Sequence, residues 1–184
     1  MKRMALALAA VLFLTGCGAD DQRMEQALEL RGRCLGASEC GFRAKLTLDY
    51  TDTVEEFTLD CSADPDGNVM FSVAAPEEIA GISGKITGSG ITFDDTVLAF
   101  GLLAQDRLSP VSAPWVLMNC LRSGYITACC REGELLRITV DDSYADDALH
   151  LDIWLGDGDV PLRAEILWQG SRVLSIDVGN FTFV

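Results

Sequence analysis

Apolar and polar residues alternate strictly along much of the chain. From Phe42 to Tyr50 every second residue is apolar, a period typical of a β-strand with one buried and one exposed face. The alternation returns after turn-forming residues such as Asp64-Pro65-Asp66-Gly67-Asn68, where proline, glycine and short polar side chains favour a tight turn. Strands are predicted at residues 42–50, 57–61, 69–73, 82–87, 91–93, 96–103, 125–130, 135–141, 148–155, 160–168 and 171–183.

Before the first strand, the spacing of apolar residues is helical. Asp20 and Asp21 suit the N-terminus of a helix, where a carboxylate caps free N–H groups and favours the helix dipole. Gly36 suits its end, and Arg31 interrupts its apolar stripe. The apolar residues at helical spacing are Met24, Ala27, Leu28, Cys34 and Leu35.

A second helix is predicted between residues 112 and 123. Ser112 is placed to cap it, Pro114 is tolerated in its first turn, and Gly124 is placed to end it. Trp115 and Met118 lie on its apolar side. A run of short strands with two helices and no alternation of strand and helix indicates an α+β fold with an antiparallel meander.

A sheet of about ten strands must curl, split or close. We therefore expect a curved, mostly antiparallel sheet that forms an incomplete β-barrel, with the N-terminal and mid-chain helices on its concave face. Residues 23–184 would form this single domain.

The N-terminus has the features of an export signal. Lys2 and Arg3 precede ten apolar residues from Met4 to Phe13, a run too short to span a bilayer but typical of a signal peptide. Leu14-Thr15-Gly16-Cys17 is similar to the lipobox of bacterial lipoproteins. It predicts a signal peptide at residues 1–16, a lipidated Cys17 with a short tether at 17–22, and a lipid anchor on the extracytoplasmic face of the cell membrane. The alternative is an ordinary signal peptide with an incidental cysteine.

The charge of the chain excludes some partners. Its 28 acidic residues outnumber 14 basic ones, which gives a net charge of −14. Such a surface repels phosphate backbones and anionic headgroups, so nucleic-acid binding and adhesion through a basic face are not expected. The membrane partner is instead reached through the lipid anchor.

Few residues suggest catalysis. His150 is the only histidine and alternates with apolar neighbours on the polar face of a strand, so no His-based triad or zinc site is predicted. We expect no enzyme activity, no cofactor and no metal. Six cysteines allow up to three disulfides, or they remain reduced in the core; they are Cys34, Cys40, Cys61, Cys120, Cys129 and Cys130.

Three segments together resemble a known superfamily. They are a helix followed by the strand Phe42 to Tyr50, a mid-chain helix among antiparallel strands, and a last hairpin from Pro161 to Phe183 that closes on Asn180-Phe181. This order resembles the LolA/LolB lipoprotein-carrier superfamily. The resemblance implies an incomplete barrel whose helices cover an apolar cavity that holds acyl chains.

Large apolar residues on the inward faces are candidates to line such a cavity, or they form an ordinary core. The candidates are Phe57, Phe71, Phe93, Phe100, Trp115 and Met118. The sequence thus predicts a membrane-anchored lipoprotein that binds an apolar ligand such as a lipid or acyl chain. The alternative is an envelope protein–protein interaction module with a fully packed core.

Overall fold

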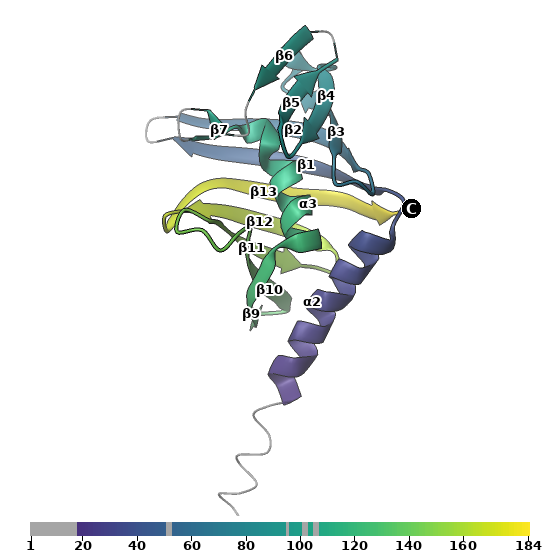
Figure 1. The fold of residues 1–184 in the computed structure, drawn as a ribbon, viewed down its shortest axis with the longest axis vertical. Coiled ribbons are helices and arrows are strands. Elements are labelled where there is room, and N and C mark those ends of the chain that lie inside the picture. Colours follow the sequence, from purple (N-terminus) through teal and green to yellow (C-terminus); the bar gives the residue numbers. More distant parts are fainter. Residues whose placement is uncertain (1–17, 51–52, 95, 101–102, 105–106) are drawn as a thin grey trace, which may run out of the picture.

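The computed structural model describes residues 18–50, 53–94, 96–100, 103–104 and 107–184. Strands dominate the described chain, and two α-helices accompany them (Figure 1). In chain order the elements are α2 (Gly18–Gly36), β1 (Cys40–Tyr50), β2 (Thr53–Ala63), β3 (Val69–Ala75), η1 (Glu77–Ile79), β4 (Ser83–Thr87), β5 (Gly90–Phe93), β6 (Thr96–Phe100), β7 (Leu103–Ala104), β8 (Arg107–Leu108), η2 (Pro110–Ser112), α3 (Ala113–Ser123), β9 (Tyr125–Glu132), β10 (Leu135–Asp141), β11 (Leu149–Leu155), β12 (Pro161–Trp168) and β13 (Ser171–Phe183).

Eleven of the described strands form one curved antiparallel sheet. Their spatial order is β6-β5-β4-β3-β2-β1-β13-β12-β11-β10-β9, and the edge strands β6 and β9 do not pair with each other. The sheet is therefore an incomplete barrel, and the predicted α+β fold class is confirmed. The sequence predicted a simple meander, but the last strand, β13, returns to pair with the first strand, β1.

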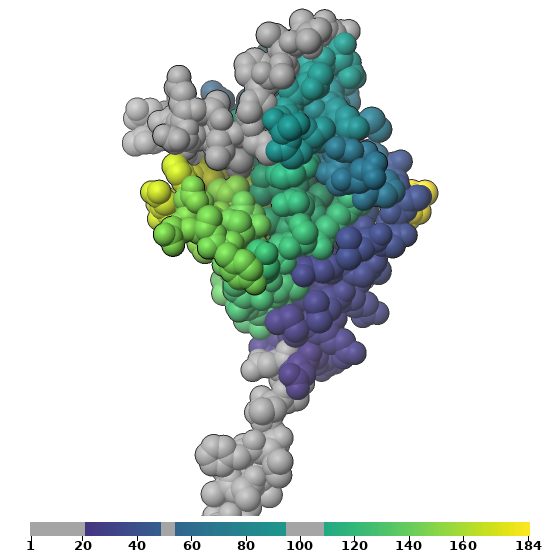
Figure 2. Space-filling model, viewed as in Figure 1, coloured from purple at the N-terminus to yellow at the C-terminus, as the bar shows by residue number. Residues whose placement is uncertain are grey.

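This topology explains the position of α3. The first half of the sheet grows outward from β1 to β6, and the second half runs back from β9 to β13. The chain must therefore pass from one edge of the sheet to the other after β6. The α3 helix makes this passage and lies across the sheet, with α2 beside its C-terminal end (Figures 1 and 2). Neither described helix is long and apolar enough to cross a membrane.

The core lies between this face of the sheet and the helices. In β1 the side chains of Phe42, Ala44, Leu46 and Leu48 are buried, while Arg43 on the opposite face is exposed. The predicted alternation of buried and exposed positions is thus confirmed. Most of α3 is buried as well, and its side chains Leu117 and Met118 have no exposed surface.

The predicted mid-chain helix is present, but its ends have other physical causes than expected. Ser112 does not cap α3 with its side chain; its Oγ donates to the carbonyl of Ser109, 2.6 Å away. Gly124 ends the helix with an ordinary φ of −65°. A Cβ there would lie 2.4 Å from Val140 Cγ1, so glycine is required by close packing.

Candidate functional site

One row of inward residues crosses the first half of the sheet. Phe42, Cys61, Phe71, Gly84 and Phe93 are consecutive register partners on β1 to β5. Gly84 has no side chain, so the rings of Phe71 and Phe93 meet edge to face across it with centroids 5.7 Å apart. Edge-to-face rings of this kind stabilise by about 0.5–1.5 kcal/mol beyond their burial.

The candidate cavity residues fall into different environments. Phe71 and Met118 are buried in the core, whereas Phe57, Phe93 and Trp115 are half-buried at its margin. The side chain of Phe100 lies outside the described residues. Of these candidates, Phe71 and Phe93 are in ring contact, while Phe57 is the register partner of Leu46 further along β2.

An apolar rim, formed by Val111 and Trp115, lies at the N-terminal end of α3. The two residues are one helical turn apart and both are half-buried against the core. Trp115 faces the turn between β4 and β5, because a Cβ on Gly88 would lie 3.5 Å from Trp115 Cζ2. Further along α3, the side chains of Leu117 and Met118 have no exposed surface.

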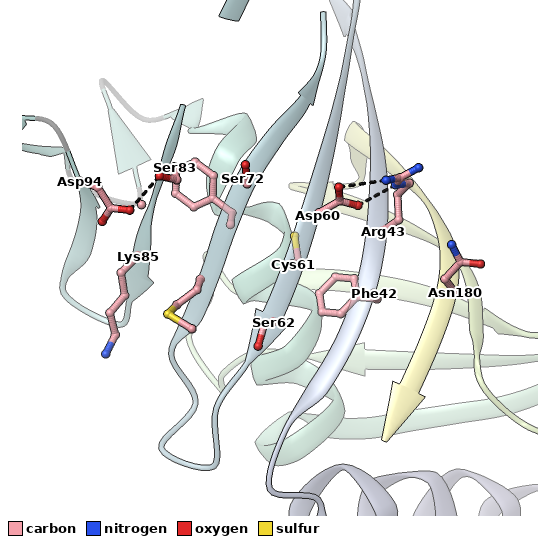
Figure 3. Close-up of a pocket in the computed structure, with 13 residues that line it drawn as sticks. Phe42, Arg43, Asp60, Cys61, Ser62, Ser72, Ser83, Lys85, Asp94 and Asn180 are labelled. Carbon is pink, nitrogen blue, oxygen red and sulfur yellow. Dashed lines mark hydrogen bonds and ion pairs between the residues drawn. The ribbon is translucent and has the colours of Figure 1, made fainter. Parts of the chain in front are cut away.

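A second candidate site lies on the opposite face of the sheet. It is an open groove of about 630 Å³ that crosses β1 to β4 and is also lined by Asp94, after β5, and Asn180 of β13. Register places Arg43 beside Asp60, Asp60 beside Ser72, and Ser72 beside Ser83 along one wall. Ser62, Met70 and Lys85 line the other wall (Figure 3). We call this hollow the outer groove.

Charges in the outer groove are held in pairs. Arg43 donates to both carboxylate oxygens of Asp60, at 2.7 and 2.9 Å, and these bonds lower the pKa of Asp60. Ser83 Oγ donates to Asp94 Oδ2 at 2.8 Å. The groove thus offers hydrogen-bonding walls of little net charge. The sequence alone did not identify these residues as a site. The signal it offers is the opposite charge of residues that face each other across the β1–β2 hairpin.

The cysteines occupy distinct positions. Cys34, Cys40, Cys61 and Cys120 are buried, Cys129 and Cys130 are half-buried, and all six are free thiols in the structure. Burial raises the pKa of Cys120 to about 12. Cys129 and Cys130 are adjacent in β9, where successive side chains point to opposite faces. Among the described residues, no group of three or more histidine, cysteine, aspartate or glutamate side chains is placed to hold a metal ion.

His150 lies at the exposed end of β11, where Nδ1 is 2.5 Å from Asp141 Oδ1 on the neighbouring strand β10. The His150 side chain is about half exposed, at 48%. It forms a cross-strand surface contact.

The predicted lipidation site, Cys17, lies outside the described residues. Gly18 is the first described residue and also the first residue of α2. Residues 18–22, expected to be a tether, are therefore helical.

Solved structures to which this chain is similar include three bacterial proteins. A LolA superfamily protein from Nitrosomonas europaea has a TM-score of 0.45 and 8% identity, covering 86% of this chain and 93% of that chain. A DUF1329 family protein from Desulfovibrio piger has a TM-score of 0.48 and 9% identity, covering 89% and 92%. Lipoprotein LppX from Mycobacterium tuberculosis has a TM-score of 0.41 and 13% identity, covering 90% and 96%.

At these TM-scores and identities the likeness carries no argument about ligand or partner. No protein-family model and no curated protein sequence matches the chain.

Proposed function

We propose that the protein is an extracytoplasmic lipoprotein, anchored through an acylated Cys17, whose domain binds an apolar ligand without catalysis. The lipobox-like quartet Leu14 to Cys17 and the preceding apolar run support the anchor. Because α2 begins at Gly18, the acyl chains would join the domain through a helix, which limits how far the domain moves from the membrane surface.

The single observation that carries the ligand proposal is the half-buried state of Trp115 and Val111. Both side chains pack against the edge of the core and are only partly buried. The rest of their apolar surface is therefore in contact with water. Covering such surface stabilises by about 25 cal/mol per Å². The ligand would lie along this rim and against the β4–β5 turn, which Trp115 faces.

Native mass spectrometry of the full chain, extracted from membranes in detergent, tests the ligand. We expect a non-covalent lipid adduct on the wild-type chain and its loss from Trp115→Ala. The matched control is Tyr144→Ala, which removes an aromatic side chain that is 83% exposed in the β10–β11 connection. The absence of any adduct on the wild-type chain, or its equal retention in Trp115→Ala, would exclude the rim as a ligand site.

The anchor has its own test. Cys17→Ala should release the chain from the membrane fraction and remove the acyl mass from the N-terminal peptide. A wild-type chain without this mass would contradict the lipoprotein proposal, while leaving the ligand proposal open to the first experiment.

A second candidate function is docking of an envelope protein in the outer groove, as expected for an interaction module. The groove volume of about 630 Å³ and its serine and charged walls favour it. A photoreactive residue at position 72 should then crosslink to one partner in cells, while the same residue at position 171, in the β12–β13 hairpin, should not. Equal labelling from both positions would argue against a specific groove partner.

A further inference from the structure

Two buried thiols meet where α2 is joined to the sheet. Cys34 lies in the last turn of α2 and Cys40 is the first residue of β1, and neither has exposed surface. A hydrogen bond between the two side chains raises the pKa of Cys34 and lowers that of Cys40. The two thiols are therefore neighbours at this junction, although five residues separate them in the chain.

The connection between these cysteines has a fixed path. The N–H of Ala37 donates to the carbonyl of Arg33 at 3.1 Å, which continues the helix for one more bond. Ser38 donates its N–H to the carbonyl of Val184 at 2.7 Å, and Val184 returns a bond to Glu39 at 2.9 Å. The backbone of Val184 thus holds the connection between the two cysteines in place.

Arg122 of α3 completes this junction. Its Nε donates to the carbonyl of Cys34 at 3.1 Å, and its Nη1 donates to the carbonyl of Asp64 in the β2–β3 turn. Its buried Nη2 has no hydrogen-bond partner among the described residues, and the guanidinium is near enough to act on the Cys40 thiol. The hydrogen bond from Cys34 and the charge of Arg122 lower the pKa of Cys40 to about 7 and so favour its thiolate.

The other cysteines have different surroundings. Cys61 lies in the aromatic row between Phe42 and Phe71. Cys120 lies near Arg31 and Asp142, and Cys130 bonds to Arg137. Among the described cysteines, Cys34 and Cys40 are the only two that are not adjacent in the chain and whose thiols interact with each other.

We propose that Cys34 and Cys40 form a disulfide that staples the end of α2 to the start of β1. This inference rests on the proposed export, because disulfides persist in oxidising compartments. The oxidant is a disulfide-bearing exchange partner, either a protein or a small molecule.

The exchange has two steps that balance. The Cys40 thiolate attacks one sulfur of the partner's disulfide, forms a mixed disulfide and releases the first partner thiolate. Cys34, after losing its proton, attacks the Cys40 sulfur and releases the second partner thiolate. Cys34 and Cys40 are oxidised by two electrons in total, and the partner is reduced to a dithiol. Since both cysteines are buried in the folded domain, the exchange takes place before the junction closes during folding.

Tryptic mapping tests this pairing sharply. Cleavage after Arg33 and Arg43 releases one peptide that holds both Cys34 and Cys40. The full chain is taken from the membrane fraction, denatured without reductant, treated with iodoacetamide and digested. We expect this peptide unalkylated and lighter by two hydrogen atoms than its reduced form. The peptides 46–85 and 108–122, which hold Cys61 and Cys120 singly, should be alkylated and serve as internal controls.

Thermal unfolding supplies a second readout. Reductant should lower the melting temperature of the wild-type chain by about 5–10 °C, as expected for loss of one disulfide in a chain of this size. The Cys34→Ser/Cys40→Ser double variant should not respond to reductant. Cys61→Ser, the matched control, also loses a buried thiol but should respond as the wild type does.

The outcome is separable from the export proposal. A chain found in the cytoplasm with free thiols would contradict the export proposal. In that case the purified, reduced chain is refolded with oxidised glutathione, which tests the pairing separately. Closure of the Cys34–Cys40 peptide in that refolding supports the pairing on its own. Full alkylation of this peptide after refolding, or a bridge from either cysteine to another position, would overturn the pairing.

Discussion

Phe71 and Phe93 are two strands apart and touch only because Gly84 lies between them. Their rings meet at 90° with centroids 5.7 Å apart. A Cβ on Gly84 would lie 2.3 Å from the carbonyl oxygen of Thr92 and 3.0 Å from the Phe71 ring. The backbone of β5 cannot yield without breaking its pairing with β4. We therefore predict that Gly84→Ala lowers the free energy of unfolding by about 3 kcal/mol, as overpacking of a core does.

Urea unfolding measures this effect, and Gly179→Ala is the matched control. Gly179 also lies in a strand, but a Cβ there meets no atom within 4 Å and its φ is not in the left-handed region. Its substitution should change the free energy of unfolding by less than about 0.5 kcal/mol. Equal effects of the two substitutions would show that the Phe71–Phe93 contact tolerates a wider spacing.

Arg31 provides a second prediction, because it caps the C-terminal end of α3. Its Nε donates to the carbonyl of Leu121 at 2.9 Å, and its Nη2 donates to those of Cys120 and Gly124 at 3.3 and 2.6 Å. The Cys120 carbonyl also accepts the backbone N–H of Gly124, at 3.0 Å, while the last carbonyls of a helix generally lack a donor within it, and a cation there favours the helix dipole. Arg31→Ala should therefore lower the free energy of unfolding by about 2–3 kcal/mol.

Arg131→Ala is the control for this prediction. Arg131 is exposed on β9 and donates to the carbonyl of Glu134 within the same hairpin, so its loss should have little effect on unfolding. Hydrogen exchange should also show faster exchange in the last turn of α3 for Arg31→Ala. A stability loss without this local change would mean that the arginine acts elsewhere than at the helix end.

Local patterns predicted most of the elements, because each strand face and helix stripe is recorded in neighbouring residues. The spacing from Phe42 to Leu48 identified the buried face of β1 correctly. The pairing of β1 with β13 was missed, because register partners such as Lys45 and Asp177 lie more than a hundred positions apart in the chain. Periodicity carries no information on which distant strands become neighbours.

The candidate sites were less predictable for the same reason. The sequence marked Arg31 as an interruption of an apolar stripe, but not the α3 carbonyls that it meets. It marked Cys34 and Cys40 as two of six cysteines without pairing them. The outer groove arises from the register of β1 to β4, and a shift of one residue in any of these strands would remove its wall.

Gly32 offers a prediction in the opposite direction. It lies inside α2, and a Cβ there would meet no atom within 4 Å. Glycine in a helix interior is about 1 kcal/mol less favourable than alanine. Gly32→Ala should therefore raise the melting temperature by about 2–4 °C. An unchanged or lower value in differential scanning calorimetry would indicate that this face of α2 is covered by another surface in the intact protein.

The last prediction concerns pH and the ion pair at the outer groove. The hydrogen bonds from Arg43 lower the pKa of Asp60 below its ordinary value of 3.8. A carboxylate with a lowered folded-state pKa stabilises the fold above the unfolded-state pKa, and this contribution is lost as the pH falls through the folded-state pKa. Asp60→Asn should therefore be less stable than the wild type at neutral pH, and the difference should vanish in acid.

NMR titration of the Asp60 carboxyl measures the cause directly. Both side chains are about half exposed, at 52% and 53%, so water screens the pair and the stability difference is small. The pKa of Asp60 should rise to its ordinary range in Arg43→Gln. It should stay low in Lys45→Gln, which removes a charge from the same strand that pairs with Glu56 instead. Equal shifts in both variants would mean that general charge, and not the two hydrogen bonds, sets the acidity of Asp60.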